Sequence, residues 1–231
     1  MNTIPIDRQD LAELSHAASV FGEALLARDR AVACDLVASL ALVHGGFTVI
    51  DSVIAPAMQE IGERWECGDI DVATEHAATF VAREALAILD RTCRVRSWLP
   101  TAPRVLTFAP SGELHELPVV MVASAMERLG WQTLSLGCNM PALEAAAMAR
   151  IFRADVVCMS ITSADGADAA VDAVRALASI GEPRPEIWVG GGATTDEALV
   201  LRLRAAGVRF VGASIADLAC MADRRVVIAA G

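Results

Sequence analysis

The sequence has no extended run of basic residues. Its 19 Lys and Arg residues are outnumbered by 29 Asp and Glu residues, which gives a formal net charge of −10 at pH 7 and a pI of about 4.8. A surface with this charge repels the phosphate backbone of DNA or RNA. We therefore expect no direct binding to nucleic acid.

The sequence also lacks the features of membrane and secreted proteins. Charged residues, Gly or Pro interrupt each apolar run before it reaches the roughly 20 residues needed to cross a bilayer, and the polar N-terminus, MNTIPIDRQD, is not a secretion signal. The six cysteines are scattered without a CxxC pair or zinc spacing, which is typical of free thiols in a reducing compartment. These features predict a cytoplasmic protein that does not bind membranes.

Residues 1–98 are expected to form a four-helix bundle. Hydrophobic residues make up 55% of the chain, and in this part they recur at helical spacing without strand-like alternation. The first apolar stripe consists of Leu11, Leu14, Ala18, Phe21 and Leu25. The expected helices end near Arg28, at Gly45, at Gly68 and near Arg94, with Asp71 as the N-cap of the last helix and Pro56 as a kink in the third. Four helices of this length with short connections favour a bundle.

Residues 99–231 show a different pattern, in which strands and helices alternate. The expected strands are 104–109, 131–137, 155–162, 186–191 and 208–212, and the helices between and after them are about 117–130, 142–153, 166–180, 195–206 and 214–223. This alternation predicts a doubly wound, parallel five-stranded sheet of the flavodoxin-like α/β class. Ligands of such sheets bind beyond the carboxyl ends of the strands, at the topological switch point.

Three of the loops at that edge carry residues suited to a ligand. Glu113 and His115 follow the first strand, where an imidazole can coordinate a metal while a carboxylate fixes its tautomer. Ser160 and Thr162 end the third strand and offer hydroxyl groups. The triplet 190–192 is all glycine and leaves the backbone open to a flat or long group (Gly190, Gly191 and Gly192).

These loops resemble those of the cobalamin-binding module, whose motif is Asp-x-His-x-x-Gly, then Ser-x-Leu, then Gly-Gly. The resemblance implies that His115 is the lower cobalt ligand, that Ser160 and Thr162 meet the buried nucleotide tail, and that the glycines admit it. The sequence departs from the motif twice, with Glu113 at the Asp position, as in the light-sensing branch of the family, and Pro118 at the Gly position. A proline is tolerated there because the first turn of a helix leaves its N–H groups unpaired.

The stretch WECGDIDVATEH, residues 65–76, resembles the cap of light-sensing members of the family, the CarH-type regulators. Their Trp-x9-Glu-His pattern is matched by Trp65, Glu75 and His76 without a gap. The resemblance implies that Trp65 packs against a 5′-deoxyadenosyl group, that Glu75 hydrogen-bonds it, and that His76 ligates cobalt after light removes it. The helix-turn-helix domain that precedes the cap in those regulators is absent from residues 1–231, so the expected output is a protein partner, as in regulators of the AerR type.

The resemblance therefore implies a non-enzymatic, adenosylcobalamin-dependent light sensor. Photolysis of the Co–C bond is expected to change conformation, oligomeric state or partner binding, and we expect a homo-oligomer. One alternative is the corrinoid carrier protein of a methyltransferase system, which shares both domains but needs an open upper corrin face. A weaker alternative is a photosensor that holds haem or a bilin such as biliverdin, alone or beside cobalamin.

Overall fold

The computed structural model describes residues 8–93, 99–212 and 214–229. The chain forms two compact units, Met1–Arg94 and Val95–Gly231. The predicted domain boundary after residue 98 falls on residues 94–98, which lie outside the described residues.

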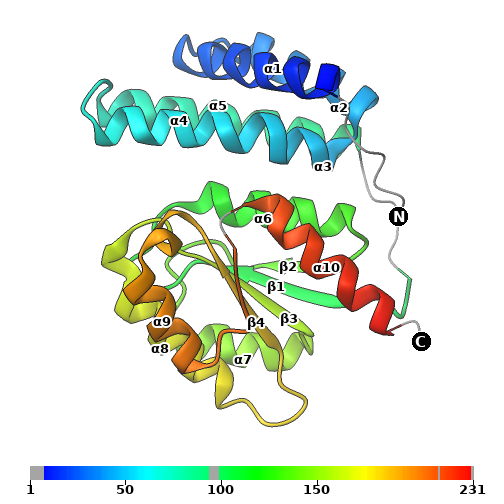
Figure 1. Ribbon diagram of the computed structural model, residues 1–231, viewed down its shortest axis with the longest axis vertical. Helices are drawn as coiled ribbons and strands as arrows, with labels where there is room; N and C mark the ends of the chain where they lie inside the picture. Colours follow the sequence, from blue (N-terminus) through cyan, green and yellow to red (C-terminus); the bar gives the residue numbers. More distant parts are fainter. Residues whose placement is uncertain (1–7, 94–98, 213, 230–231) are drawn as a thin grey trace. The chain divides into compact units, whose positions relative to one another are not determined.

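The first unit is entirely helical over its described residues (Figure 1). Its elements are α1 (Arg8–Leu26), α2 (Arg30–His44), α3 (Gly46–Val49), the π-helical segment η1 (Ile50–Ile54), α4 (Ala55–Glu66) and α5 (Val72–Thr92). Because α3, η1 and α4 follow one another without a break, these elements form four rods. The predicted helical N-terminal region is confirmed.

The ends of these helices follow from local chemistry. The Asp71 carboxylate accepts a hydrogen bond from the Thr74 N–H at 2.7 Å and caps α5, as predicted. Pro56 has no N–H to donate to the preceding turn, and the chain widens into η1 immediately before it, with the Ala55 N–H bonded to the Ile50 carbonyl. The predicted stripe of α1 is buried at Leu14, Phe21 and Leu25 and partly buried at Ala18, whereas its first member, Leu11, is exposed.

The second unit is a parallel five-stranded sheet. Its strands are β1 (Arg104–Phe108), β2 (Gln132–Ser135), β3 (Val156–Ser160), β4 (Glu186–Gly190) and β5 (Phe210–Gly212), and they lie in the order β2-β1-β3-β4-β5. This is the predicted flavodoxin-like order. The chain reverses its direction of winding between β1 and β3, so the switch point lies between the ends of these two strands.

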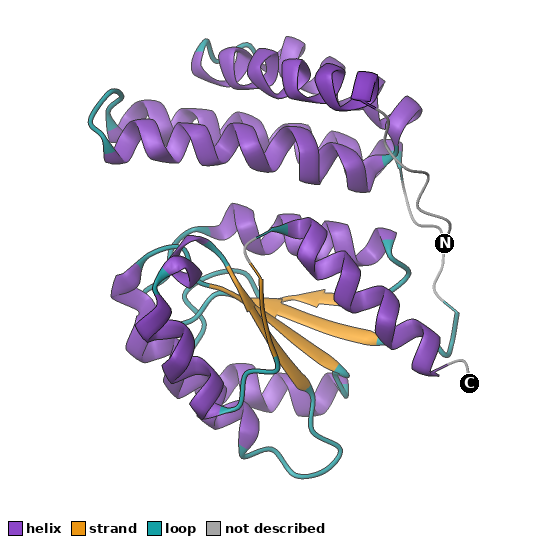
Figure 2. Cartoon of the chain, viewed as in Figure 1, coloured by secondary structure: helices purple, strands orange, loops and turns teal. Residues whose placement is uncertain are grey.

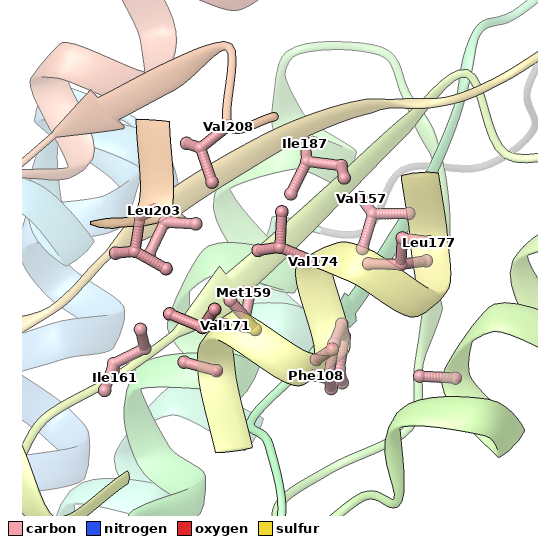
Figure 3. Packing of buried hydrophobic residues seen from close by; sticks show 14 of the residues in the cluster. Phe108, Val157, Met159, Ile161, Val171, Val174, Leu177, Ile187, Leu203 and Val208 are labelled. Atoms are coloured by element: carbon pink, nitrogen blue, oxygen red, sulfur yellow. The ribbon is translucent and has the colours of Figure 1, made fainter. Parts of the chain in front are cut away.

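Helices cover both faces of this sheet (Figure 2). They are α6 (Glu116–Arg128), α7 (Ala142–Phe152), α8 (Ala167–Ala178), α9 (Glu197–Ala206) and α10 (Ile215–Ala229), with short 3-10 turns at Ala164–Gly166 and Gly192–Thr195. The larger core lies under α7, α8 and α9, and its packing is seen in Figure 3 at Phe108, Val157, Met159, Val174 and Leu177.

The opposite face of the sheet, under α6 and α10, has a smaller core. Trp131 and Trp188 are buried there and meet edge to face with ring centroids 5.9 Å apart. Burial raises the pKa of the Cys158 thiol, which shares this core. Among the described residues, no helix is long and apolar enough to cross a membrane.

Candidate functional site

The switch point brings together two of the predicted loops. Glu113 and His115 lie in the loop between β1 and α6, and Thr162 lies in the loop between β3 and α8. These loops are 49 residues apart in sequence, yet the Glu113 carboxylate bridges them by direct hydrogen bonds. The parallel pairing of β1 with β3 places both loops at one edge of the sheet.

Glu113 is a buried carboxylate, only 1% exposed, and it accepts four hydrogen bonds. One oxygen, Oε1, takes the His115 ring Nδ1 at 2.5 Å and the His115 N–H at 3.1 Å. The other, Oε2, takes the N–H groups of Thr162 at 2.6 Å and Ser163 at 3.2 Å. Burial raises the pKa of Glu113, but the hydrogen bonds from His115, Thr162 and Ser163 outweigh it and lower that pKa to about 2.

The ionised state of Glu113 fixes the state of His115. A carboxylate can only accept, so the ring nitrogen Nδ1 of His115 must carry the proton that is shared with Oε1. In the neutral ring the lone pair is then on Nε2, and 43% of the side chain is exposed. Metal-ligating histidines are oriented in the same way, by a carboxylate on the second ring nitrogen. His115 thus has the chemistry of a metal ligand.

His115 stands at the N-cap position of α6. Pro118 follows in the first turn of this helix, where the missing N–H costs no intrahelical bond. The helix therefore begins normally although the sequence departs here from the glycine of the family motif.

The hydroxyl residues after β3 have different environments. Ser160 is the last residue of β3, is buried, and pairs in register with Gly190. Thr162 uses its backbone N–H to hold Glu113, but its hydroxyl Oγ1 is buried and has no hydrogen-bond partner among the described residues. A buried hydroxyl without a partner costs free energy, so Thr162 Oγ1 fits a polar ligand group at this edge.

The glycine triplet packs directly against the Ser160–Thr162 segment. Gly191 has φ +107°, and a Cβ at this position would lie 2.3 Å from the Ile161 carbonyl oxygen. A Cβ on Gly190 would lie 3.1 Å from the Gly212 oxygen, and one on Gly192 would lie 3.1 Å from the Thr162 oxygen. The close approach of two loops therefore requires Gly191, whether or not a ligand is bound.

The loop after β2 contributes a residue that the sequence motifs did not single out. Asn139, at φ +55°, accepts the Gly112 N–H through Oδ1 at 2.9 Å and donates its own N–H to the Glu113 carbonyl at 2.9 Å. It thereby fixes the loop that carries Glu113 and His115. Its sequence signal is the turn-forming stretch GCNMP, because asparagine tolerates a left-handed backbone.

The remaining predicted residues, Trp65, Glu75 and His76, lie in the first unit. Trp65 is in the last turn of α4 and is 39% exposed, and Glu75 and His76 are in the first turn of α5. The two helices pack on each other, and the turn that joins them is closed by a hydrogen bond from the Gly68 N–H to the Trp65 carbonyl at 3.0 Å. The end of α4 and the start of α5 meet at this turn (Figure 1), so by sequence position all three residues are at the same end of the helix pair.

Glu75 and His76 form a second carboxylate–imidazole pair. Glu75 Oε2 lies 2.5 Å from the ring Nδ1 of His76, and Glu75 Oε1 accepts the Thr79 hydroxyl at 2.7 Å. The His76 side chain is 76% exposed, whereas that of Glu75 is 16% exposed. As at His115, the carboxylate occupies Nδ1, and Nε2 is the nitrogen suited to a metal.

Comparison with known proteins gives related results for both units. A B12 binding domain family matches residues 103–221, and a second B12 binding domain family matches residues 20–90. The chain is 32% identical over 147 residues to the HTH-type transcriptional repressor CarA of Myxococcus xanthus. The aligned residues make up 62% of this chain and 47% of that repressor. It is 30% identical over 156 residues to the repressor CarH of the same organism, which covers 65% and 49%. The chain thus spans about half the length of these curated relatives.

Among solved structures, the Methanosarcina barkeri monomethylamine corrinoid protein is similar, with a TM-score of 0.70. The match covers 90% of this chain and 97% of that protein at 16% identity. A likeness at this level of identity shows a shared fold.

Proposed function

The chain belongs to the B12-binding domain family, and from that premise we propose that it is a light sensor that uses adenosylcobalamin. The observation that supports light sensing is the Glu75–His76 pair at the start of α5, because it adds a second oriented, exposed imidazole to the one at His115. The similarity to the repressors CarA and CarH supports a regulatory role. We further propose that the chain is not an enzyme and that it acts in the cytoplasm.

The chain's own residues suit the parts of the cofactor. His115 would bind the cobalt from below through Nε2, with Glu113 holding the ring. Thr162 Oγ1, which is buried and has no partner in the described part of the chain, would bond the nucleotide tail beside Ser160 and the triplet Gly190–Gly192. Trp65 offers a flat apolar surface to the adenine. When bound, adenosylcobalamin supplies a cobalt–carbon bond that light can break.

His76 would act after that bond is broken. Its ring is exposed and already oriented by Glu75, so its Nε2 would be a second nitrogen able to bind the cobalt without a change of tautomer. We propose that this ligand exchange changes the conformation of the chain, its oligomeric state as a homo-oligomer, or its affinity for a protein partner that carries the output.

A second candidate is the corrinoid carrier protein of a methyltransferase system. The fold shared with the monomethylamine corrinoid protein favours it. A carrier must leave the upper position of the cobalt open to two enzymes in turn. The oriented His76 and the exposed Trp65 favour a sensor over a carrier, because they would occupy or cover that position.

Absorption spectra of the purified chain, loaded with adenosylcobalamin in the dark and then illuminated, test these proposals. We expect wild type to convert to a stable product. Its absorption spectrum should be that of a cobalamin with two nitrogen ligands on cobalt. His76→Ala should bind in the dark and photolyse as wild type does, but it should give a different final spectrum. His16→Ala, which removes another exposed histidine of the same unit, is the control.

Two results would contradict the sensor, and a third would contradict the role of His76. A wild-type spectrum unchanged by light would favour the carrier, and haem or bilin bands in the purified protein would favour another tetrapyrrole. Identical final spectra of wild type and His76→Ala would remove His76 from the upper position.

A further inference from the structure

Thr79 lies one helical turn after Glu75 on α5 and donates its hydroxyl to Glu75 Oε1 at 2.7 Å. Glu75 Oε2 holds the ring Nδ1 of His76 at 2.5 Å. The three side chains therefore form a short chain of hydrogen bonds, which runs from the partly buried Thr79 to the exposed His76. None of the family motifs discussed above includes Thr79.

The same arrangement occurs at the switch point of the sheet. One oxygen of Glu113 is anchored by the N–H groups of Thr162 and Ser163, and the other holds the His115 ring at the same 2.5 Å. In both places a carboxylate with one anchored oxygen uses the second oxygen to orient an exposed imidazole. At Glu113 the anchor is backbone, which no side-chain substitution removes, whereas at Glu75 a single side-chain hydroxyl provides it.

We propose that Thr79 is a positioning residue that fixes the Glu75 carboxylate and, through it, the ring of His76 with Nε2 facing outward. The proposal rests on the proposed function of His76 as a cobalt ligand. Its physical basis is rotation of the Glu75 carboxylate, because without the Thr79 hydroxyl nothing described in the structure holds Oε1. A freely rotating carboxylate holds Nδ1 for less of the time, so the ring also populates the tautomer that carries its proton on Nε2. That tautomer has no lone pair on Nε2 to bind a metal.

The first test measures the ring directly, in the full chain without cofactor. Nitrogen-15 NMR reports the tautomer of each histidine, and the chain has four histidines, so His76 can be assigned by comparison with His76→Ala. The spectra are recorded at about pH 8.5, so that the two tautomers of the neutral ring are compared. We expect Thr79→Val to lower the ratio of Nδ1-protonated to Nε2-protonated His76 about 5-fold, which is the effect of losing one net hydrogen bond.

Matched variants separate the hydroxyl from its surroundings. Thr79→Ser keeps the donor and should restore the wild-type ratio. Thr92→Val removes another hydroxyl of α5, which donates to the Ile88 carbonyl at 3.0 Å, and should leave His76 unchanged. Thr79→Ala removes the donor without adding a methyl group, and it serves if the valine variant does not fold by circular dichroism.

The second test uses the chain loaded with adenosylcobalamin and illuminated. Loss of a residue that orients a metal ligand lowers metal affinity by about 10-fold or more, so the fraction of Thr79→Val protein with the wild-type final spectrum should fall accordingly, with rescue by Thr79→Ser. Folded valine and alanine variants with wild-type ring shifts would overturn the proposal, and so would altered shifts with an unaltered final spectrum. If wild type itself does not respond to light, the sensor function fails, while the ring shifts still decide the role of Thr79.

Discussion

Replacing Glu113 by glutamine should destabilise the fold by an amount that can be worked out from its surroundings. Glutamine has nearly the shape of a protonated glutamic acid, so Glu113→Gln compares the charged group with a neutral one in the same place. The pKa of Glu113 is lowered from its ordinary value of 4.5 to about 2. At about 1.36 kcal/mol per pKa unit, this difference corresponds to about 3 kcal/mol of stability near pH 7.

The pH dependence has a defined sign. Because the pKa of Glu113 is lower in the folded chain than in the unfolded chain, its contribution is complete above about pH 4.5 and is lost as the pH falls towards 2. The stability gap between wild type and Glu113→Gln should therefore be constant between about pH 5 and 7, and near pH 3 it should fall to about half.

Urea unfolding of the two proteins at several pH values measures this gap. The matched control is Glu144→Gln, which neutralises an exposed carboxylate in the first turn of α7 and should change stability by about 0.5 kcal/mol or less. The reasoning is refuted if Glu113→Gln behaves like Glu144→Gln at about pH 7. A gap that widens as the pH falls would also refute it, because that sign requires a raised pKa.

Three further predictions concern the site and its partners. His115→Ala should weaken cobalamin binding or return the cofactor's own base to cobalt. Electron paramagnetic resonance of the Co(II) form, with nitrogen-15-labelled protein and unlabelled cofactor, will show whether the nitrogen bound to cobalt comes from the protein. Nitrogen-15 splitting that persists in the variant would contradict the assignment of His115. Gly191→Ala should lower the free energy of unfolding by about 2 kcal/mol or more, because residue 191 has φ +107° and its Cβ would lie 2.3 Å from the Ile161 oxygen. Gly181→Ala, whose added Cβ would meet no described atom within 4 Å, should be nearly neutral in urea unfolding. With a net charge of −10, the chain of 231 residues should give no sequence-specific DNA shift in gel electrophoresis, in light or dark, at physiological salt; selective binding by the chain alone would contradict output through a protein partner.

Most of the fold could be predicted from the sequence because its signals are local. Helical spacing, the cap at Asp71 and the alternation of strands with helices each depend on a few neighbouring residues, and these elements lie where they were expected. The π-helical segment η1 was not predicted, because a proline indicates a disturbed helix without specifying how the backbone accommodates it.

The candidate site could be predicted only as a set of residue types at strand ends. The motif indicated that Glu113 and His115 belong together, but it could not indicate that the same carboxylate also holds the amides of Thr162 and Ser163, because that contact depends on how β1 pairs with β3. Likewise, the motif explains Gly191 by access for a ligand, whereas the structure adds a contact with the Ile161 backbone that no local pattern encodes.

The two carboxylate–imidazole pairs differ in a way that suits different roles. Glu113 is almost fully buried and anchored by backbone, so His115 is held in one orientation, as a ligand that stays on the metal throughout would require. His76 is 76% exposed, and its partner Glu75 is anchored by a single hydroxyl, so its ring can be displaced at small cost. A side chain that can bind the metal only after another group has left needs this freedom to move. The difference in anchoring therefore supports the proposed roles, in which His115 would stay on the metal and His76 would bind it only after light has acted.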